Sequence, residues 1–242
     1  MLARRRSISV AAAARRFGVN PMTIRRDLKA METTGVLVRC YGGALAAQRI
    51  SFEFAFDERR RRRLAEKARI GAVAAGRVRP GQTIMLDTGT TTLQVARALA
   101  RRGVGCRVIT SSLVIASELW GRAGIELMLA GGQVRPGSPD LVGPMTEIML
   151  DRFTADVAFL GSDGIDADRG CFAGDAEAAR VCQKMAAGAR RVVVVADSCK
   201  LGSAGAVRFL NIADIHELIT DKAADGSFVR GLRRKGVRVI LA

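Results

Sequence analysis

The sequence predicts an α/β protein in two parts, a small basic N-terminal part and a larger part built on a mostly parallel sheet. From residue 80 onward, short apolar runs alternate with helical stretches, a pattern typical of parallel strands joined by helices. Residues 1–69 hold 17 Lys and Arg against 6 Asp and Glu, so they carry most of the net charge of +16. We therefore expect a small domain over residues 1–50, a linker helix over 51–76 and a second domain over 77–242.

Two short helices separated by a tight turn are predicted in the first domain. Residues 10–17 form the first helix, and Ser9 before them is a favoured N-cap. Gly18 lies in the turn, and Asn20 and Pro21 suit the cap and the first position of a second helix. A short helix, a turn containing glycine and a second helix together make a helix-turn-helix.

The second helix has an apolar face and a basic face. Ile24, Leu28 and Met31 recur at helical spacing and are expected to face a core. The basic face can enter a DNA major groove, although a solvated basic face is the ordinary alternative. A strand over residues 36–40 and a turn at residues 41–43 follow as a hairpin, or wing. The residues predicted to bind double-stranded DNA are Asn20, Met22, Thr23, Arg25, Arg26, Lys29, Arg39 and Tyr41.

Seven apolar runs of the second domain are expected to be strands. Helical patterns such as residues 92–102 and 176–189 lie between most of them. In parallel sheets of this kind, ligands bind at the carboxyl ends of the strands. The expected strands are Thr83–Leu86, Arg107–Thr110, Ile125–Leu129, Val157–Gly161, Val192–Ala196, Glu217–Thr220 and Val237–Leu241.

A threonine-rich loop follows the first of these strands and leads directly into a helix. Residues 87–92, DTGTTT, place backbone N–H groups, small hydroxyls and a helix N-terminus around one point, which suits a phosphate. A purely structural helix cap is the alternative. The loop is neither a GxGxxG motif nor a Walker loop, so a dinucleotide or a nucleoside triphosphate is not expected, and no cofactor is predicted.

Later strand ends add carboxylates, a cation and glycines. Asp163 suits the hydroxyls of a sugar, and Lys200 suits a phosphate. Asp166 is expected to cap its own loop. These strand ends together predict a site for a phosphorylated sugar. Its residues are Asp87, Thr88, Gly89, Thr90, Thr91, Thr92, Ser111, Gly131, Gly132, Asp163, Gly164 and Lys200.

Five consecutive arginines occupy residues 59–63 of the predicted linker helix. They form either a solvated helix surface or an additional contact with DNA phosphates. The five cysteines are scattered without a CxxC pair and His216 is the single histidine, so neither a zinc site nor a disulfide framework is expected. No apolar run could span a bilayer or serve as a signal peptide, so we expect a cytoplasmic protein without a membrane partner.

The helix-turn-helix, the wing and the polar strand ends described above resemble the DeoR family of bacterial sugar-metabolism regulators. The resemblance implies a winged helix-turn-helix and a sensor domain related in fold to ribose-5-phosphate isomerase, which binds phosphorylated sugars. It also implies a repressor of a sugar operon that forms homo-oligomers, dimers or tetramers. Departures are Tyr41 and Asn20, where histidine and serine are frequent, and Cys199, where serine is usual. The matching stretches are RFGV at 16–19, MTIRRDL at 22–28, GVLVRCYGGA at 35–44, LDTGTTT at 86–92, ADVAFLGSDGID at 155–166, EA at 177–178, ADSCKLG at 196–202 and LITD at 218–221.

Members of the family have a further helix before the one at residues 10–17. Residues 1–6 resemble only the tail of that helix, so we expect either a start farther upstream or a weakened DNA-binding domain. The leading hypothesis is a transcriptional repressor that a phosphosugar releases from its operator. A phosphosugar sensor without DNA binding is one alternative, and an isomerase that uses Asp163, Asp166 and Lys200 is another. The particular sugar, the operator and the sign of regulation stay open.

Overall fold

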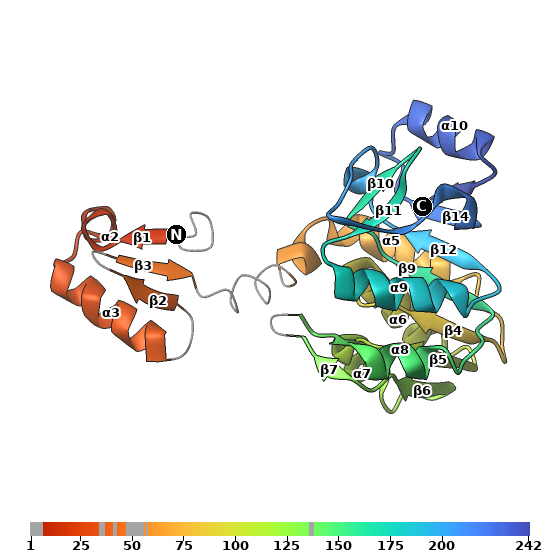
Figure 1. Ribbon diagram of the computed structural model, residues 1–242, viewed down its shortest axis with the longest axis horizontal. Helices are drawn as coiled ribbons and strands as arrows, with labels where there is room; N and C mark the ends of the chain where they lie inside the picture. Colours follow the sequence, from red (N-terminus) through yellow and green to blue (C-terminus); the bar gives the residue numbers. More distant parts are fainter. Residues whose placement is uncertain (1–6, 34–36, 41–42, 47–55, 57, 136–137) are drawn as a thin grey trace. The chain divides into compact units, whose positions relative to one another are not determined.

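The computed structural model describes residues 7–33, 37–40, 43–46, 56, 58–135 and 138–242 (Figure 1). The chain divides into two compact units. One, here the N-terminal unit, lies within residues 1–59, and the other, the C-terminal unit, is formed by residues 60–135 and 139–242.

The described residues of the N-terminal unit include two helices joined by a tight turn and a three-stranded antiparallel sheet (Figure 1). In the sheet, β3 pairs with both β1 and β2. The structure thus confirms the predicted helix-turn-helix and wing, and adds β1 as a strand that the sequence analysis did not predict. The elements are β1 (Ser7–Ser9), α2 (Val10–Phe17), α3 (Pro21–Thr33), β2 (Leu37–Cys40) and β3 (Gly43–Ala46).

Local sequence sets the ends of both helices. The Ser9 side chain accepts a hydrogen bond of 3.5 Å from the first turn of α2. Gly18 ends α2 in the left-handed conformation, with φ 66, which glycine adopts without strain. Asn20 Oδ1 accepts the backbone N–H of Met22 at 2.8 Å. The predicted caps at Ser9 and Asn20 are therefore confirmed. Glycine is favoured just after a helix, so the sequence also predicts that this helix stops at Gly35, which lies outside the described residues.

A small apolar core holds the N-terminal unit together. Its alanines let α2 approach α3 closely. The expectation that Met31 faces this core is wrong, because 37% of Met31 is exposed. The core lies beside the first two turns of α3, since α2 has only eight residues, and Met31 belongs to the third turn. The buried residues are Val10, Ala13, Ala14, Ile24, Leu28 and Ala44.

A seven-stranded sheet forms the centre of the C-terminal unit, and every neighbouring pair of its strands is parallel. All seven strands predicted from the sequence are present, with ends that differ by at most one residue. In order across the sheet, the strands are β15 (Arg238–Leu241), β14 (Glu217–Thr220), β12 (Val192–Val195), β9 (Val157–Leu160), β4 (Thr83–Leu86), β5 (Cys106–Thr110) and β6 (Ile125–Leu129).

Helices cover both faces of this sheet (Figure 1). On one face α5 packs against α6 and over β12 and β14, and on the other face α9 packs over β9 beside α8. All four valines of β12 are buried, as a strand covered on both faces requires. The helices are α5 (Leu64–Ala75), α6 (Thr90–Arg102), α7 (Leu113–Leu119), α8 (Pro144–Leu150), α9 (Ala176–Ala187), α10 (Gly226–Arg234) and the short 3-10 turns η1 (Ser198–Lys200) and η2 (Ile212–Asp214).

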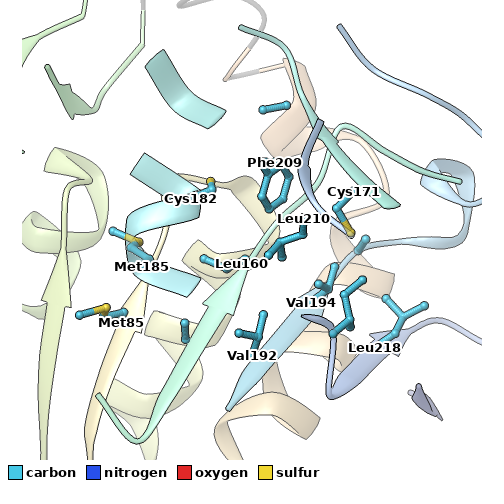
Figure 2. Packing of buried hydrophobic residues seen from close by; sticks show 14 of the residues in the cluster. Met85, Leu160, Cys171, Cys182, Met185, Val192, Val194, Phe209, Leu210 and Leu218 are labelled. Atoms are coloured by element: carbon cyan, nitrogen blue, oxygen red, sulfur yellow. The ribbon is translucent and has the colours of Figure 1, made fainter. Parts of the chain in front are cut away.

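The core beneath α9 is closely packed from several elements (Figure 2). Strand residues such as Met85 and Val194 belong to the same buried cluster as Cys182 and Met185 of α9. Phe209 comes from a small antiparallel sheet of β10 (Gly164–Asp166), β11 (Gly170–Ala173) and β13 (Val207–Leu210). The sequence analysis predicted neither this sheet nor the hairpin of β7 (Gln133–Val134) and β8 (Leu141–Val142). β7, β8 and β10 have only two or three residues, and β11 and β13 contain a glycine or an arginine instead of a continuous apolar run.

The predicted linker helix over residues 51–76 is divided in the structure. Residues 58–61 are helical, residues 62 and 63 form a turn, and α5 starts at Leu64. Ile70 and Ala74 of α5 are fully buried, so this helix is an integral part of the C-terminal unit. Residues 51–55 and 57 lie outside the described residues. The difference arises because the positive φ of Arg63 interrupts the helix.

Candidate DNA-binding face and effector site

The side of α3 that faces away from the core carries the basic side chains. Thr23 is half-buried at its margin. The guanidinium Nη1 of Arg25 lies 3.5 Å from Met22 Sδ, so these two side chains lie side by side. An exposed basic helix face suits phosphate oxygens and base edges. The exposed residues of this face are Met22, Arg25, Arg26 and Lys29.

Of three further predicted DNA contacts, one already caps a helix and two have side chains outside the described residues. Asn20 is exposed, but its side-chain oxygen already caps α3. Arg39 lies in β2, where its backbone is paired with Ala44, and its side chain is outside the description. Tyr41 lies outside the described residues.

The order of the strands marks one place on the large sheet. If the seven strands are numbered by their order along the chain, their order across the sheet from β6 to β15 is 3-2-1-4-5-6-7. The direction in which strands are added therefore reverses between β4 and β9. Ligands of open α/β sheets bind outside the carboxyl ends of the strands where the order reverses. The loops that leave β4 and β9 begin at Asp87 and Gly161. Tertiary structure therefore brings the predicted DTGTTT loop and the GSDG segment together.

Thr92 shapes the loop after β4. Its hydroxyl accepts the Gly89 N–H at 2.8 Å and lies 3.0 and 2.9 Å from the carbonyl oxygens of Asp87 and Gly89, either of which can accept its proton. A Cβ at position 89 would lie 2.9 Å from this hydroxyl, which is why glycine fits there. Thr90 and Thr91 then open α6, and first-turn N–H groups of a helix have no partner within the helix. The loop therefore presents donors to an anion.

Asp87 is buried with half of its carboxylate unused. Its Oδ2 accepts the Gly161 N–H at 2.8 Å, whereas Oδ1 has no hydrogen-bond partner among the described residues. Burial raises the pKa of Asp87 to about 6, against the opposing effects of the Gly161 N–H and of the Thr92 and Cys182 side chains. Cys182 Sγ lies 3.7 Å from Oδ2, and burial raises the pKa of this thiol well above its usual value. In the same loop, Thr88 Oγ1 is also a buried oxygen without a hydrogen-bond partner among the described residues.

Asp163 and Lys200 follow the next two strands of the sheet. Asp163 comes after β9, and its charge adds to the elevation of the Asp87 pKa. Lys200 closes η1, directly after β12. Because β4, β9 and β12 are neighbours, Asp87, Asp163 and Lys200 lie along one edge of the sheet. The predicted carboxylates and the predicted cation are thus near one another.

Other predicted effector residues are engaged in packing. Ser111 is buried, and its carbonyl oxygen accepts the Leu141 N–H at 2.8 Å. Thr146 donates to the carbonyl of Gly131 at 2.7 Å, and a Cβ at Gly132 would lie 1.9 Å from its Oγ1. Gly132 therefore permits the close approach of α8, whereas a Cβ at Gly131 would meet no atom within 4 Å.

Gly164 and Asp166 shape the strand after the GSDG segment. A Cβ at Gly164 would lie 2.7 Å from the carbonyl oxygen of Ser203, so glycine allows these chains to touch. The Asp166 carboxylate accepts the N–H groups of Asp168 and Arg169 at 2.9 and 2.8 Å, which lower its pKa. The prediction that Asp166 caps its own loop is confirmed.

Sequence reasoning missed a buried lysine at the same edge. Lys67 of α5 is only 5% exposed. A Cβ at Gly71 would lie 2.5 Å from the backbone of Gln94, so α5 and α6 touch there. Both helices begin at the carboxyl edge of the sheet, and Lys67 and Thr90 each lie four residues before this contact, which places Lys67 beside the first turn of α6. A lysine at a core position of an apolar helix pattern was the available signal.

Arg135 ties the β7–β8 hairpin to this edge. It donates to both carboxylate oxygens of Asp140 at 3.0 and 2.7 Å and also pairs with Asp175. Asp175 in turn caps α9 through the Ala178 N–H at 2.9 Å. This network joins the segment after β7 to the start of α9, beside the carboxyl edge of the sheet.

Comparison with known proteins agrees with both units. Residues 1–49 match the family model of the DeoR-like helix-turn-helix domain, and residues 62–222 match that of the DeoR C terminal sensor domain. The chain belongs to the DeoR family. It is therefore a DNA-binding transcriptional regulator, as the sequence motifs indicated.

Curated relatives of this DeoR-family regulator match over most of their length. The HTH-type transcriptional regulator GlpR of Haloferax volcanii is 33% identical over 96% of this chain and 90% of its own. The HTH-type transcriptional repressor CsqR of Escherichia coli is 30% identical over 100% and 92%. The glycerol-3-phosphate regulon repressor of Escherichia coli is 30% identical over 88% and 84%.

Solved structures similar to the DeoR-family chain include ribose 5-phosphate isomerase A. The enzyme from Methanocaldococcus jannaschii aligns with a TM-score of 0.43 at 21% identity, over 56% of this chain and 53% of that one. The mostly parallel α/β fold itself is established by the sheet described above. Among the described residues, no group of three or more His, Cys, Asp or Glu could hold a metal ion. In the same part of the chain, no helix is both long and apolar enough to cross a bilayer.

Proposed function

We propose that this regulator represses a sugar-metabolism operon and that a phosphorylated sugar, bound at the carboxyl edge of the large sheet, releases it from DNA. The observation that carries the proposal is the buried Asp87 carboxylate, whose Oδ1 has no described partner and lies at the start of the threonine-rich loop. A buried acceptor without a partner is costly, and a ligand hydroxyl would satisfy it.

The charges at this edge suit the two ends of a sugar phosphate. The N-terminus of α6 with Thr90 and Thr91, together with Lys67 and Lys200, favours the phosphate. The carboxylates of Asp87 and Asp163 would repel a phosphate but accept hydrogen bonds from sugar hydroxyls. We therefore place the phosphate toward the helix start and the hydroxyls toward the two aspartates.

Operator recognition is assigned to the basic face of α3, with Arg25 and Arg26 at base edges or phosphates and Thr23 at a phosphate. Arg39 and Tyr41 of the wing would contact the backbone or the minor groove. We propose a homo-oligomer, a dimer or a tetramer, that offers paired N-terminal units to a repeated operator. The effector shifts this assembly only as far as it binds the DNA-competent and released arrangements with different affinity. Such a regulator is expected in the cytoplasm, where its DNA is.

An isomerase is the second candidate, and the site argues against it. Its proposed carboxylate pair needs Asp166, whose Oδ1 accepts two backbone N–H groups of its own loop. These bonds lower the pKa of Asp166 and make it a weaker base. We therefore propose that the protein is not an enzyme. Incubation with ribose 5-phosphate should yield no ribulose 5-phosphate, and catalytic formation of the product would contradict the proposal.

Fluorescence anisotropy tests the regulator directly. Labelled DNA from upstream of its own operon and an unrelated duplex are titrated at two salt concentrations, and a panel of phosphosugars is then added. Tight binding to the first DNA, released by one compound, is the expected result. Equal binding to both duplexes that is lost with salt would mean that only charge acts, which would contradict operator recognition.

Arg25→Ala separates the two activities. Loss of a base or phosphate contact should weaken operator binding about 5- to 150-fold, equivalent to roughly 1–3 kcal/mol, and leave effector binding unchanged. Arg101→Ala is the matched control, because it removes the same charge from an exposed position at the end of α6. If Arg25→Ala lost both activities while remaining folded, the assignment of α3 to DNA alone would be wrong.

A further inference from the structure

The last arginine of the 59–63 run adopts an unusual backbone conformation. Arg63 has φ 51 and is the only residue other than glycine with a positive φ in the part of the chain that the structure describes. This region is unfavourable for residues with a side chain and persists where the surroundings hold it. The position of Arg63 is therefore determined by what its guanidinium contacts.

Those contacts lie at the ends of two strands of the sheet. Arg63 Nη1 donates to Ser198 Oγ at 2.7 Å. It also lies 3.9 Å from Asp197 Oδ1 and 3.7 Å from Asp221 Oδ2. The two carboxylates are only 3% and 1% exposed, whereas the Arg63 side chain is 39% exposed. Buried carboxylates require a nearby cation or several hydrogen bonds, and Arg63 supplies that cation.

Backbone hydrogen bonds fix Asp221 and the turn of residues 197–200 relative to each other. Asp221 accepts the N–H of Ser198 at 2.7 Å and the N–H of Ala223 at 3.0 Å. The carbonyl of Asp197 accepts the N–H of Lys200 at 3.0 Å. The residue assigned to the effector phosphate and the residue that anchors the start of α5 are therefore parts of one short turn, residues 197–200.

We propose that Arg63 is a positioning residue that couples effector binding to the segment leading from the DNA-binding unit. The coupling uses the effector site proposed above. The two carboxylates and the cations Arg63 and Lys200 balance in charge, so a phosphate added at Lys200 attracts the guanidinium. The guanidinium carries five N–H donors and can attract the anion while it holds Ser198. Phosphate binding and the Arg63 anchor consequently stabilise each other.

The proposal gives the arginine run a role besides solvation or DNA contact. Coupling between two events is reciprocal, so the factor by which phosphate strengthens the anchor equals the factor by which the anchor strengthens phosphate binding. Loss of the Arg63 side chain should therefore weaken phosphate binding, although Arg63 need not touch the sugar. It should also loosen the start of α5, where the Lys67 N–H donates to the Arg63 carbonyl at 3.1 Å.

Hydrogen–deuterium exchange of the full chain measures the coupling both at α5 and at the turn that contains Lys200. Peptides covering residues 64–75 and 193–205 are followed with and without inorganic phosphate and a panel of sugar phosphates. Arg63→Gln is compared with Arg61→Gln, which removes the same charge from an exposed helical position two residues away. Phosphate should slow exchange in both peptides of the wild type and of Arg61→Gln. Arg63→Gln should lose that protection and bind phosphate about 5- to 20-fold more weakly by calorimetry.

Arg63→Gly distinguishes the guanidinium from backbone strain, because glycine favours the left-handed conformation but has no side chain. The same loss of protection in the glycine variant is the expected result. Wild-type phosphate affinity in either Arg63 variant would overturn the coupling and leave the effector site intact. Failure of the wild type to bind any of the phosphates would overturn both proposals.

Discussion

Asp87→Asn should make the protein more stable and less responsive. The substitution keeps the shape of the side chain but removes its charge. Burial raises the pKa of Asp87 from 3.8 to about 6. Because the pKa is higher in the folded protein, the contribution of Asp87 to stability is fully present below pH 3.8, is lost as the pH rises to about 6 and stays lost above it. The difference corresponds to about 3 kcal/mol of unfolding free energy at pH 7.5.

Urea unfolding of the wild type and of Asp87→Asn at pH 7.5 and at pH 4 measures this directly. The variant should gain up to about 3 kcal/mol at pH 7.5, and the gain should shrink at pH 4, where the Asp87 carboxyl is protonated in the folded protein. In the anisotropy assay, the variant should still bind its operator but need at least about 10-fold more phosphosugar for release, because it has lost a charge-assisted acceptor.

Asp221→Asn is the matched control, since it is the same change at another buried carboxylate. Both oxygens of Asp221 accept backbone N–H groups, from Ser198 and Ala223, and these lower its pKa although burial opposes them. Its contribution is present above pH 3.8 and is lost as the pH falls, so the variant should be about 1–3 kcal/mol less stable at pH 7.5. If Asp87→Asn were also destabilised at pH 7.5, the reasoning about an unsatisfied buried charge would be refuted.

Three further substitutions test the packing and the caps. Ser9→Ala removes a cap and should cost the N-terminal unit about 1 kcal/mol in thermal unfolding, and an unchanged Tm would contradict the cap. Gly71→Ala places a Cβ 2.5 Å from the Gln94 backbone and should cost about 1–3 kcal/mol in urea unfolding, and unchanged stability would contradict the tight contact of α5 with α6. Thr92→Val leaves the Gly89 N–H without its acceptor and should weaken phosphosugar binding by calorimetry, whereas unchanged affinity would remove the loop from the site.

The strands and helix caps were predictable because their signals are local. An apolar run such as residues 192–195 indicates a buried strand without reference to the rest of the chain, and the caps at Ser9 and Asn20 depend on the next few residues alone. Local signals were weaker in the antiparallel sheet beside α9, where β10 has three residues and β11 and β13 contain a glycine or an arginine instead of a continuous apolar run. They also misplaced Met31, because helical spacing does not say how far a neighbouring helix extends.

The candidate site could be predicted in its parts but not in its assembly. Parallel topology implies that strand ends share an edge, so Asp87, Asp163 and Lys200 could be assigned to one edge without a structure; their contact with an effector stays a prediction. Gly132 has the same sequence signal as a ligand-binding glycine, yet Thr146 of α8 occupies the space beside it. Only packing distinguishes these two uses of glycine.

The sequence by itself determined which segments are strands, which helix is basic and which strand ends carry polar groups. The tertiary structure alone decided that β4 and β9 are neighbours, which brings Asp87 to Gly161, 74 residues away. It also decided that Arg63 pairs with Ser198, 135 residues away. Periodicity and capping depend on neighbours a few residues apart, whereas these pairings depend on the order in which distant strands join the sheet, and no local spacing records that order.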